Sequence, residues 1–214
     1  MIKSTDEAGV LMTYRKFAVM LSCLLLFSCA AGQLKQDVVP AAEVKASPPL
    51  KATGYVELDA DIESNFQLAV DLIGNGEYGL AIKRLKSVIN REQRLIAPFI
   101  NIAIAYRKLG DTEQAEKYLL IALQMDPAHP VANNELGLIY RKIGKFKEAR
   151  AAYQLVTINH PEFQAAKINL GVLCDLYMHD FECALEQFER YLEMNPDDKN
   201  VAIWIADVKR RVRQ

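Results

Sequence analysis

The sequence lacks any clear excess of charge of one sign, because 26 Lys and Arg residues stand against 27 Asp and Glu residues, a formal net charge of -1. Such a chain creates no long-range positive field, so nucleic acid and anionic lipid surfaces are poor candidate partners. Cysteine is also scarce, with four residues and no paired C-x-x-C units. This excludes a miniprotein built on disulfides and a structural zinc site.

Recognisable catalytic motifs are missing as well. The chain has no nucleophile elbow, no phosphate-binding loop and no H-E-x-x-H motif. His129, His160 and His179 are isolated at or near expected helix connections, with no acid or cysteine at metal-ligand spacing on a shared helix face. We therefore expect no enzyme activity, no cofactor, no metal site and no small-molecule substrate.

What the chain does contain is enough apolar material for one ordinary core. Its 214 residues are 51% hydrophobic and 25% charged, which fits one domain with appendages rather than several domains.

The N-terminal region has the layout of a signal peptide. An uncharged, mostly apolar stretch from Phe17 to Phe27 follows Arg15-Lys16 and precedes small and polar residues. This stretch is much shorter than the roughly 20 residues that a membrane-spanning helix needs, so a transmembrane anchor is the weaker interpretation. Acidic residues near the start are unusual for such a segment, which leaves both Met1 and Met12 open as the true start.

The tetrad Leu26-Phe27-Ser28-Cys29 resembles a bacterial lipobox. The resemblance implies a lipoprotein signal peptide over 1–28 and a lipid-modified Cys29 as the mature N-terminus, because acyl chains hold a protein on a bilayer surface. Ala30, in place of the aspartate that retains lipoproteins at the inner membrane, implies the periplasmic face of the outer membrane. A rival lipobox ends at Cys23, and a plain signal peptide without lipid is the other alternative.

Residues 29–60 are expected to form a disordered tether. They contain Pro40, Pro48 and Pro49, scattered charges and no sustained apolar period. A segment of this composition cannot bury enough apolar surface to fold.

The remainder of the chain repeats itself every 34 residues. Shifting the sequence by that period superposes three glycines and three alanines: Gly76, Gly110 and Gly144, and Ala81, Ala115 and Ala149. A period of 34 residues is that of the tetratricopeptide repeat (TPR), a pair of antiparallel helices.

Two copies carry most of the TPR signature. In 96–129 the signature residues are Phe99, Ile102, Ala103, Tyr106, Gly110, Ala115, Leu119, Ala122 and Pro127. The copy 130–163 matches at Leu136, Gly137, Tyr140, Gly144, Ala149, Tyr153, Val156 and Pro161, with Asn133 where a large residue is usual. The chain therefore resembles the TPR family over about residues 62–198.

The outer copies are less regular. The first, 62–95, has Gln93 where a proline would close it, and the fourth, 164–198, needs one extra residue near Tyr177-Met178-His179, which predicts an irregular turn. Residues 199–214 form an amphipathic segment that we expect to cap the array. The resemblance implies an all-α, right-handed superhelical solenoid of about four TPR helical hairpins plus a C-terminal capping helix.

In the TPR family, the first helix of each pair lines a concave, peptide-binding groove. The positions that the resemblance assigns to this groove are Phe66, Val70, Ile100, Ile104, Arg107, Asn134, Leu138, Arg141, Ile168, Val172 and Asp175. Arg107 and Arg141 lie one repeat apart and could bind carboxylates or a peptide C-terminus. Alternatively, these cations only complement helix dipoles in solvent, and Ile100, Ile104 and Ile168 pack against neighbouring helices.

Cys174 and Cys183 fall on the two helices of the fourth hairpin, on either side of its lengthened turn. A disulfide is plausible if the compartment is oxidising. The alternative is that Cys174 is a small core residue and Cys183 an unrelated surface thiol.

These features together predict an outer-membrane-anchored periplasmic TPR scaffold. It would bind a protein or peptide segment for the assembly of an envelope machine such as a pilus, secretion or motility system. Its lipid would anchor it to the membrane. The alternative is a structural adaptor of the cell wall that binds peptidoglycan or its enzymes. Glycan binding would favour aromatic residues in the groove, and Phe66 is the only one assigned there.

Overall fold

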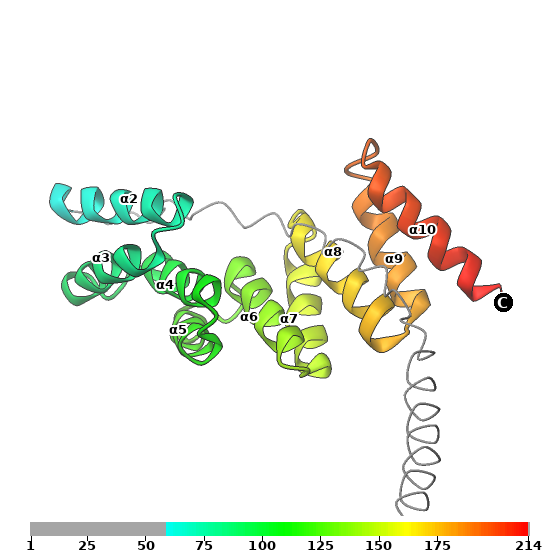
Figure 1. Ribbon diagram of the computed structural model, residues 1–214, viewed down its shortest axis with the longest axis horizontal. Helices are drawn as coiled ribbons and strands as arrows, with labels where there is room; N and C mark the ends of the chain where they lie inside the picture. Colours follow the sequence, from blue (N-terminus) through cyan, green and yellow to red (C-terminus); the bar gives the residue numbers. More distant parts are fainter. Residues whose placement is uncertain (1–58, 214) are drawn as a thin grey trace, which may run out of the picture. The chain divides into compact units, whose positions relative to one another are not determined.

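The computed structural model describes residues 59–213, which form consecutive helices (Figure 1). Their bounds are α2 Ala60–Gly74, α3 Tyr78–Arg91, α4 Ile96–Leu109, α5 Thr112–Met125, α6 Pro130–Lys142, α7 Phe146–Asn159, α8 Gln164–Leu173, a π-helical turn η1 Cys174–Met178, α9 Phe181–Leu192 and α10 Lys199–Val212. Within 59–213 the structure contains no strand.

The helices pair as consecutive antiparallel hairpins, α2 with α3, α4 with α5, α6 with α7, and α8 with α9, and α10 packs on α9. The predicted fold class, an all-α solenoid of helical hairpins with a C-terminal helix, is confirmed. The predicted signal peptide, Cys29, the rival Cys23 and nearly all of the tether lie outside the described residues. No helix within the described range has the length and apolar character required to span a bilayer.

Three of the four hairpin turns use a glycine with a left-handed backbone. Gly76, Gly110 and Gly144 have φ values of 80°, 87° and 78°. At Gly110, the glycine N–H donates to the carbonyl of Arg107 at 3.0 Å and the next N–H donates to that of Tyr106 at 3.0 Å. These bonds satisfy carbonyls that the end of a helix leaves unpaired, and glycine adopts this conformation without steric cost. The period of the glycines therefore marks the helix ends.

The fourth turn is built differently, as the sequence predicted. The first helix of this hairpin ends in the π-helical turn η1, and His179 takes the left-handed position with φ 53°. A π-helical turn holds one residue more than an α-helical turn. The extra residue of the fourth repeat is thus absorbed at the end of the helix.

Some of the helices, α5, α6 and α9 among them, begin with a polar side chain that caps the first turn. Asp111 caps α5 and Asp180 caps α9, each accepting a hydrogen bond from a backbone N–H three residues ahead at 3.1 Å. At the start of α6 the cap is His129, whose Nδ1 accepts from the N–H of Ala132 at 3.4 Å, with Pro130 at the first helical position. Such caps satisfy N–H groups that have no partner within the helix.

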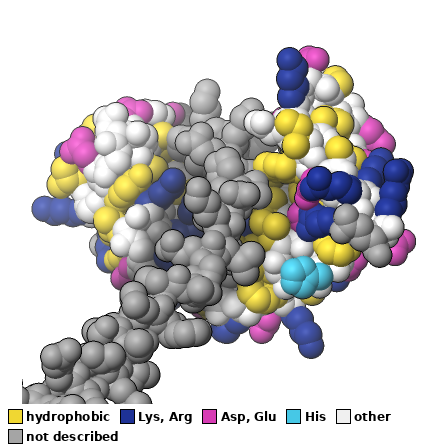
Figure 2. All heavy atoms as spheres, turned by 45° about the vertical axis from the view of Figure 1, so that its right-hand side comes forward, with side chains coloured by type: hydrophobic (Ala, Val, Ile, Leu, Met, Phe, Trp, Pro, Cys, Tyr) yellow, Lys and Arg dark blue, Asp and Glu magenta, His cyan; other side chains and the backbone are white. Residues whose placement is uncertain are grey.

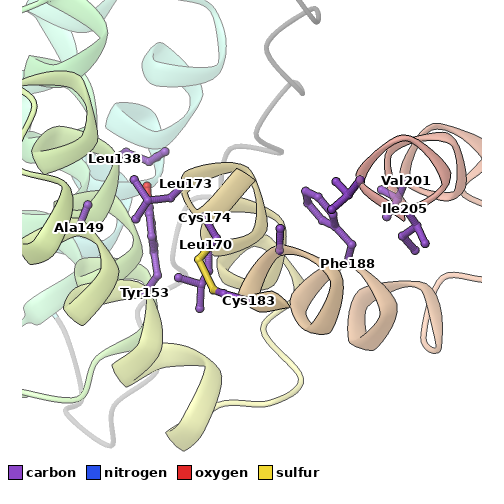
Figure 3. Packing of buried hydrophobic residues seen from close by; sticks show 12 residues of the cluster. Leu138, Ala149, Tyr153, Leu170, Leu173, Cys174, Cys183, Phe188, Val201 and Ile205 are labelled. Atoms are coloured by element: carbon purple, nitrogen blue, oxygen red, sulfur yellow. A yellow bond between two sulfur atoms is a disulfide. The ribbon is translucent and has the colours of Figure 1, made fainter. Parts of the chain in front are cut away.

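The paired helices pack by setting a large ring against a glycine. Tyr153 of α7 is fully buried, and a Cβ built on Gly137 of α6 would lie 2.4 Å from its Cε1. One repeat later, Phe188 of α9 lies in the same way over Gly171 of α8. Figure 3 shows Tyr153 and Phe188 in the core that runs from the third hairpin to α10.

Two polar residues occupy the position where Phe99 lies in the second repeat. The Nδ2 of Asn133 donates to the carbonyls of Pro127 and His129 at 3.0 and 3.1 Å. Lys167, one repeat later, donates from Nζ to the carbonyl of Pro161. Both side chains are buried, and they donate to backbone carbonyls in the connections that precede their helices. Burial lowers the pKa of Lys167 from its ordinary value.

Candidate peptide-binding face

The first helices of the hairpins form one side of the array. α2 contacts α4, α4 contacts α6, and α6 contacts α8, whereas consecutive second helices among residues 60–192 make no contact of similar extent. The first helices therefore lie closer together and form the inner side, which is the side where the sequence places the groove.

Most of the predicted groove residues are buried in the structure. Those with less than a tenth of their surface exposed are Phe66, Val70, Ile100, Ile104, Asn134, Leu138 and Asp175. Ile168, Val172, Arg107 and Arg141 are half-buried. Ile100 and Ile104 belong to the core cluster of the second and third hairpins. They therefore pack against neighbouring helices, which was the alternative to a role in the groove. Most apolar members of the set are thus core residues, and Ile168 and Val172 are partly buried against the core.

Arg107 forms an ion pair within the inner side. Its Nε donates to Oε2 of Glu135 on the next first helix at 2.6 Å, and only 2% of the Glu135 side chain is exposed. Burial raises the pKa of the Glu135 carboxyl, while the guanidinium of Arg107 opposes that shift. Arg107 therefore pairs with Glu135 through its Nε, while a fifth of its side chain is exposed.

Three asparagine side chains are buried, one on each of α4, α6 and α8. The Nδ2 of Asn169 donates to Oδ1 of Asn134 at 2.9 Å, which joins α8 to α6. Both amide atoms of Asn101, Nδ2 of Asn134 and Oδ1 of Asn169 are buried without a hydrogen-bond partner in the described chain. We call Asn101, Arg107, Asn134, Glu135, Arg141 and Asn169 the inner polar row.

Arg141 differs from its counterpart Arg107. It forms no ion pair with a carboxylate of residues 59–213, and its guanidinium lies 5.8 Å from the ring centre of Tyr177 in η1. Tyr177 is 43% exposed and also contacts Phe146. An arginine held by an exposed aromatic ring is positioned to bind a carboxylate.

The C-terminal end of the inner side is closed by a second ion pair. Nη2 of Arg211 on α10 lies 2.7 Å from Oδ1 of Asp175, and Arg211 also contacts Asp207. Figure 2 shows Lys and Arg side chains gathered at this end of the described chain, where α10 carries Lys209, Arg210 and Arg211 in its last turn. Asp175, the last predicted groove position, is thus tied to the capping helix.

Cys174 and Cys183 are bonded as a disulfide, with Cα atoms 5.9 Å apart (Figure 3). The bond joins the start of η1 to the first turn of α9, and Cys174 is fully buried. An oxygen of the Asp180 carboxylate lies within 4.8 Å of both sulfur atoms, a spacing at which three such groups could hold a metal ion. Because the sulfurs are bonded to each other, they are not thiolate ligands in this state.

The sequence interpretation missed Glu135, Asn169 and Tyr177 as members of this face. A signal was available, because Asn101, Glu135 and Asn169 follow one another at the repeat period of 34 residues. A polar residue at the same buried position of three consecutive repeats indicates a shared role on the inner side.

The hairpin array with these features defines a tetratricopeptide-type solenoid. Residues 100–162 match the family model of the tetratricopeptide repeat. Solved structures with a similar fold include MamA 41-end from Desulfovibrio magneticus RS-1, with a TM-score of 0.63 and 20% identity over 72% of this chain and 87% of that one.

Two further similar structures come from other bacteria. Pseudomonas aeruginosa pilF has a TM-score of 0.65 and 21% identity, covering 71% of this chain and 69% of that one. TTC0263, a thermophilic TPR protein of Thermus thermophilus, has a TM-score of 0.60 and 23% identity over 70% of this chain and 81% of that one.

A curated relative is the anaphase-promoting complex subunit 3 of Schizosaccharomyces pombe, 22% identical over 158 residues, or 72% of this chain. The match spans only 24% of that relative's length. The chain thus has a TPR-type helical solenoid fold.

Proposed function

We propose that this scaffold is anchored to the periplasmic face of the outer membrane through a lipid on Cys29 and binds an extended segment of an envelope protein along its inner polar row. The segment would belong to an assembly such as a pilus, secretion or motility system. The solenoid supplies the rigid surface, and the lipid supplies the membrane attachment.

The observation that carries this proposal is the set of buried amide groups without partners at Asn101, Asn134 and Asn169. A buried polar group without a hydrogen bond costs about 1–3 kcal/mol, so such groups in a native protein need a partner. Backbone N–H and C=O groups of an extended peptide recur along a strand and are matched by amide side chains, which both donate and accept.

Arg141 supplies the positive charge that, within residues 59–213, is free to pair with a ligand in the proposed site. Its guanidinium lies beside Tyr177 and has no carboxylate partner in the described chain, whereas Arg107 is neutralised by Glu135. An acidic side chain or a C-terminal carboxylate of the bound segment would pair with Arg141.

Two similar proteins are named for protein complexes. The curated relative is named as a subunit of the anaphase-promoting complex, and a structure of Naa15/Naa10 bound to HypK has a TM-score of 0.58 to this chain, covering 69% of this chain and 22% of that one. These names support a protein partner for this chain without identifying it.

The peptide site can be tested with Asn101→Leu. Because neither amide atom of Asn101 has a partner in the described chain, we expect the substitution to leave the melting temperature unchanged or higher and to weaken binding to an array of immobilised envelope-protein peptides. Arg141→Glu should remove the acidic peptides from the bound set, and Lys147→Glu on the exposed side of α7 is the matched control. An unchanged peptide profile for both inner variants would exclude this face as the site.

The anchor is tested separately by mass spectrometry of the N-terminal peptide of the mature protein. We expect the peptide to begin at Cys29 and to carry the mass of acyl chains. A mature protein that begins elsewhere, or an unmodified Cys29, would refute the lipid anchor and leave the peptide site untouched.

A further inference from the structure

Among residues 59–213, the first hairpin has a face that no other helix covers, unlike the hairpins that follow it. Leu68 of α2 corresponds, one repeat later, to Ile102 of α4, and two repeats later to Leu136 of α6. Ile102 is fully buried and Leu136 is 6% exposed, because the second helix of the preceding hairpin packs beside each of them. Leu68 is 42% exposed, since no helix of the described chain precedes α2.

The uncovered face is a groove between α2 and α3. It has a volume of about 450 Å³, with Leu68, Leu72 and Leu80 among the residues that line it. Leu80 is 54% exposed. Asn65, Lys83 and Arg84 complete the polar part of the lining, and Arg84 donates to Oδ1 of Asn65 at 2.9 Å. Exposed leucines grouped in a groove mark an interaction site rather than ordinary surface.

The two helices that form this groove carry charges of opposite sign that are unpaired within residues 59–213. On the α3 side, Lys83 and Arg84 are exposed and form no ion pair with another residue of 59–213. On α2, the exposed Asp71 precedes Leu72 and makes a side-chain hydrogen bond only with Gln67 in the same helix. One helix therefore offers an acid and the other offers bases, on either side of the leucines.

We propose that this groove binds the same groove of a second copy of the chain, so that the protein is a homodimer joined at its first hairpins. A two-fold axis parallel to α2 places α3 of the partner antiparallel to α2. The residues of α3 that would take part are those lining the groove, because the side of α3 that carries Lys86 already packs on α4 within the chain. The leucines of the two copies then meet, and Asp71 of each copy faces Lys83 of the other. A two-fold interface requires such a self-complementary patch.

The other end of the array is a poorer partner for this groove. α10 presents Lys209, Arg210 and Arg213 around a shallow surface that includes Ala206. Lys209 and Arg210 pair with Glu189 and Asp207, but Arg213 forms no ion pair within 59–213. A head-to-tail contact would bring Arg213 against Lys83 and Arg84, and like charges in an interface are repulsive. The charges thus favour contact between two N-terminal edges.

Sedimentation velocity of the chain from Ala30 onward tests the dimer. We expect a dimer that dissociates on dilution, and we expect Leu68→Asp and Leu80→Asp each to raise the dissociation constant at least about tenfold, because each places a charge in the apolar centre. Both leucines are exposed in one copy, so the melting temperature of the monomer should be unchanged. Ile203→Asp is the matched control, since Ile203 is 64% exposed on α10.

A charge exchange tests the geometry. Lys83→Glu alone and Asp71→Lys alone should each weaken the dimer, because each sets like charges opposite one another twice. An equimolar mixture of the two variants should restore dimers, since one contact is then native and the other is reversed. Failure of the mixture to associate more tightly than either variant would overturn the proposed axis.

Other results of the sedimentation experiments would overturn the proposed homodimer. A chain that stays monomeric at all concentrations, or a dimer that Leu68→Asp leaves intact, would overturn the proposal. If the chain from Ala30 is a monomer while a chain from Asp59 dimerises, residues before Asp59 occupy the groove in place of a second copy, and the homodimer is refuted for the longer protein.

Discussion

At the residue scale, the closest contact between paired helices is made where glycine faces an aromatic ring. Gly137 leaves room for Tyr153, and Gly171 leaves room for Phe188. The ring and the missing side chain together determine how near the two helices approach.

Adding a methyl group at this contact should therefore destabilise the protein. We expect Gly137→Ala to lower the free energy of unfolding by about 1–3 kcal/mol, because the new Cβ would lie 2.4 Å from the ring of Tyr153. Gly137→Leu, and Ala149→Phe at the fully buried Ala149, should cost at least as much. Urea denaturation measures these values.

The matched control for that series is Gly79→Ala. Gly79 lies in α3, and a Cβ at this position would have nothing within 4 Å. Stability should stay the same or rise slightly, since alanine favours helix over glycine. Equal losses at positions 79 and 137 would show that the contact with the ring of Tyr153 does not explain the loss at position 137.

His129 predicts a dependence of stability on pH. Burial lowers the pKa of this imidazole below its ordinary value of 6.5, and its neutral Nδ1 caps α6. Protonation removes the acceptor and puts a positive charge at a helix N-terminus, which is unfavourable. The stabilisation is present above pH 6.5 and is lost as the pH falls through the lower pKa of the folded state.

His129→Asn should remove that dependence, because asparagine caps helices without titrating in this range. Melting temperatures measured between about pH 7.5 and about pH 5.5, one unit on either side of an ordinary histidine pKa, give the comparison. The difference between the original protein and His129→Asn should widen toward the acid end. His179→Asn is the control, and a parallel pH profile in His129→Asn would contradict the role of the imidazole.

The sequence predicts single residues well where the repeat itself sets their role. Gly110 and Gly144 end helices because their spacing coincides with the hairpin turns, and Gly137 is small because a partner helix crosses there. The pairing of Arg107 with Glu135 was not predicted, because it depends on the distance between side chains of two repeats. The period places both residues on inner helices but leaves their partners undetermined.

At the scale of elements, the fourth hairpin depends on the disulfide between Cys174 and Cys183. The bond closes a loop with a sequence separation of nine residues around η1. A closed loop of this size restricts the unfolded chain and stabilises the fold by roughly 2–3 kcal/mol in the chain-entropy account.

Removing the bond should lower stability by about that amount. We expect the double substitution Cys174→Ala and Cys183→Ala to reduce the free energy of unfolding of the oxidised protein, and we expect a reducing agent to lower the stability of the original protein while leaving the double variant unchanged. A thiol count on the unfolded, non-reduced protein should find neither cysteine reactive. Two reactive thiols would show that the bond is absent.

The elements themselves follow closely from the period, including the irregular turn at Tyr177 to His179 that one extra residue required. The form of that turn could not be predicted, since the extra residue could have lengthened a loop instead of widening a helix. The choice depends on α8 and α9 keeping their contact across Gly171 and Phe188.

At the scale of the whole molecule, α10 covers the last apolar face of the array. Val201, Ile205 and Val208 are buried by packing on α9, and Trp204 lies over Phe188 with ring centres 5.6 Å apart. In a repeat array each unit contacts only its neighbours, so an uncovered end weakens the adjacent unit first.

A chain that ends at Asp198 should therefore lose stability locally. Exposure of three aliphatic side chains and the facing surface of α9 costs of order 5 kcal/mol. Hydrogen exchange should show lost protection in α8 and α9, with protection in α4 and α5 largely kept. The point variant Val208→Asp should have the same effect in a full-length chain, and uniform loss of protection across all helices would show that the array unfolds as one cooperative unit.

The widened turn at the end of α8 has a consequence for how this chain tolerates changes in length. Because η1 takes up a whole residue by changing its hydrogen-bonding pattern, α9 and α10 are not rotated away from the helices before them. Natural variants with one residue added or lost should therefore be commoner at this connection than at the three that end in a left-handed glycine.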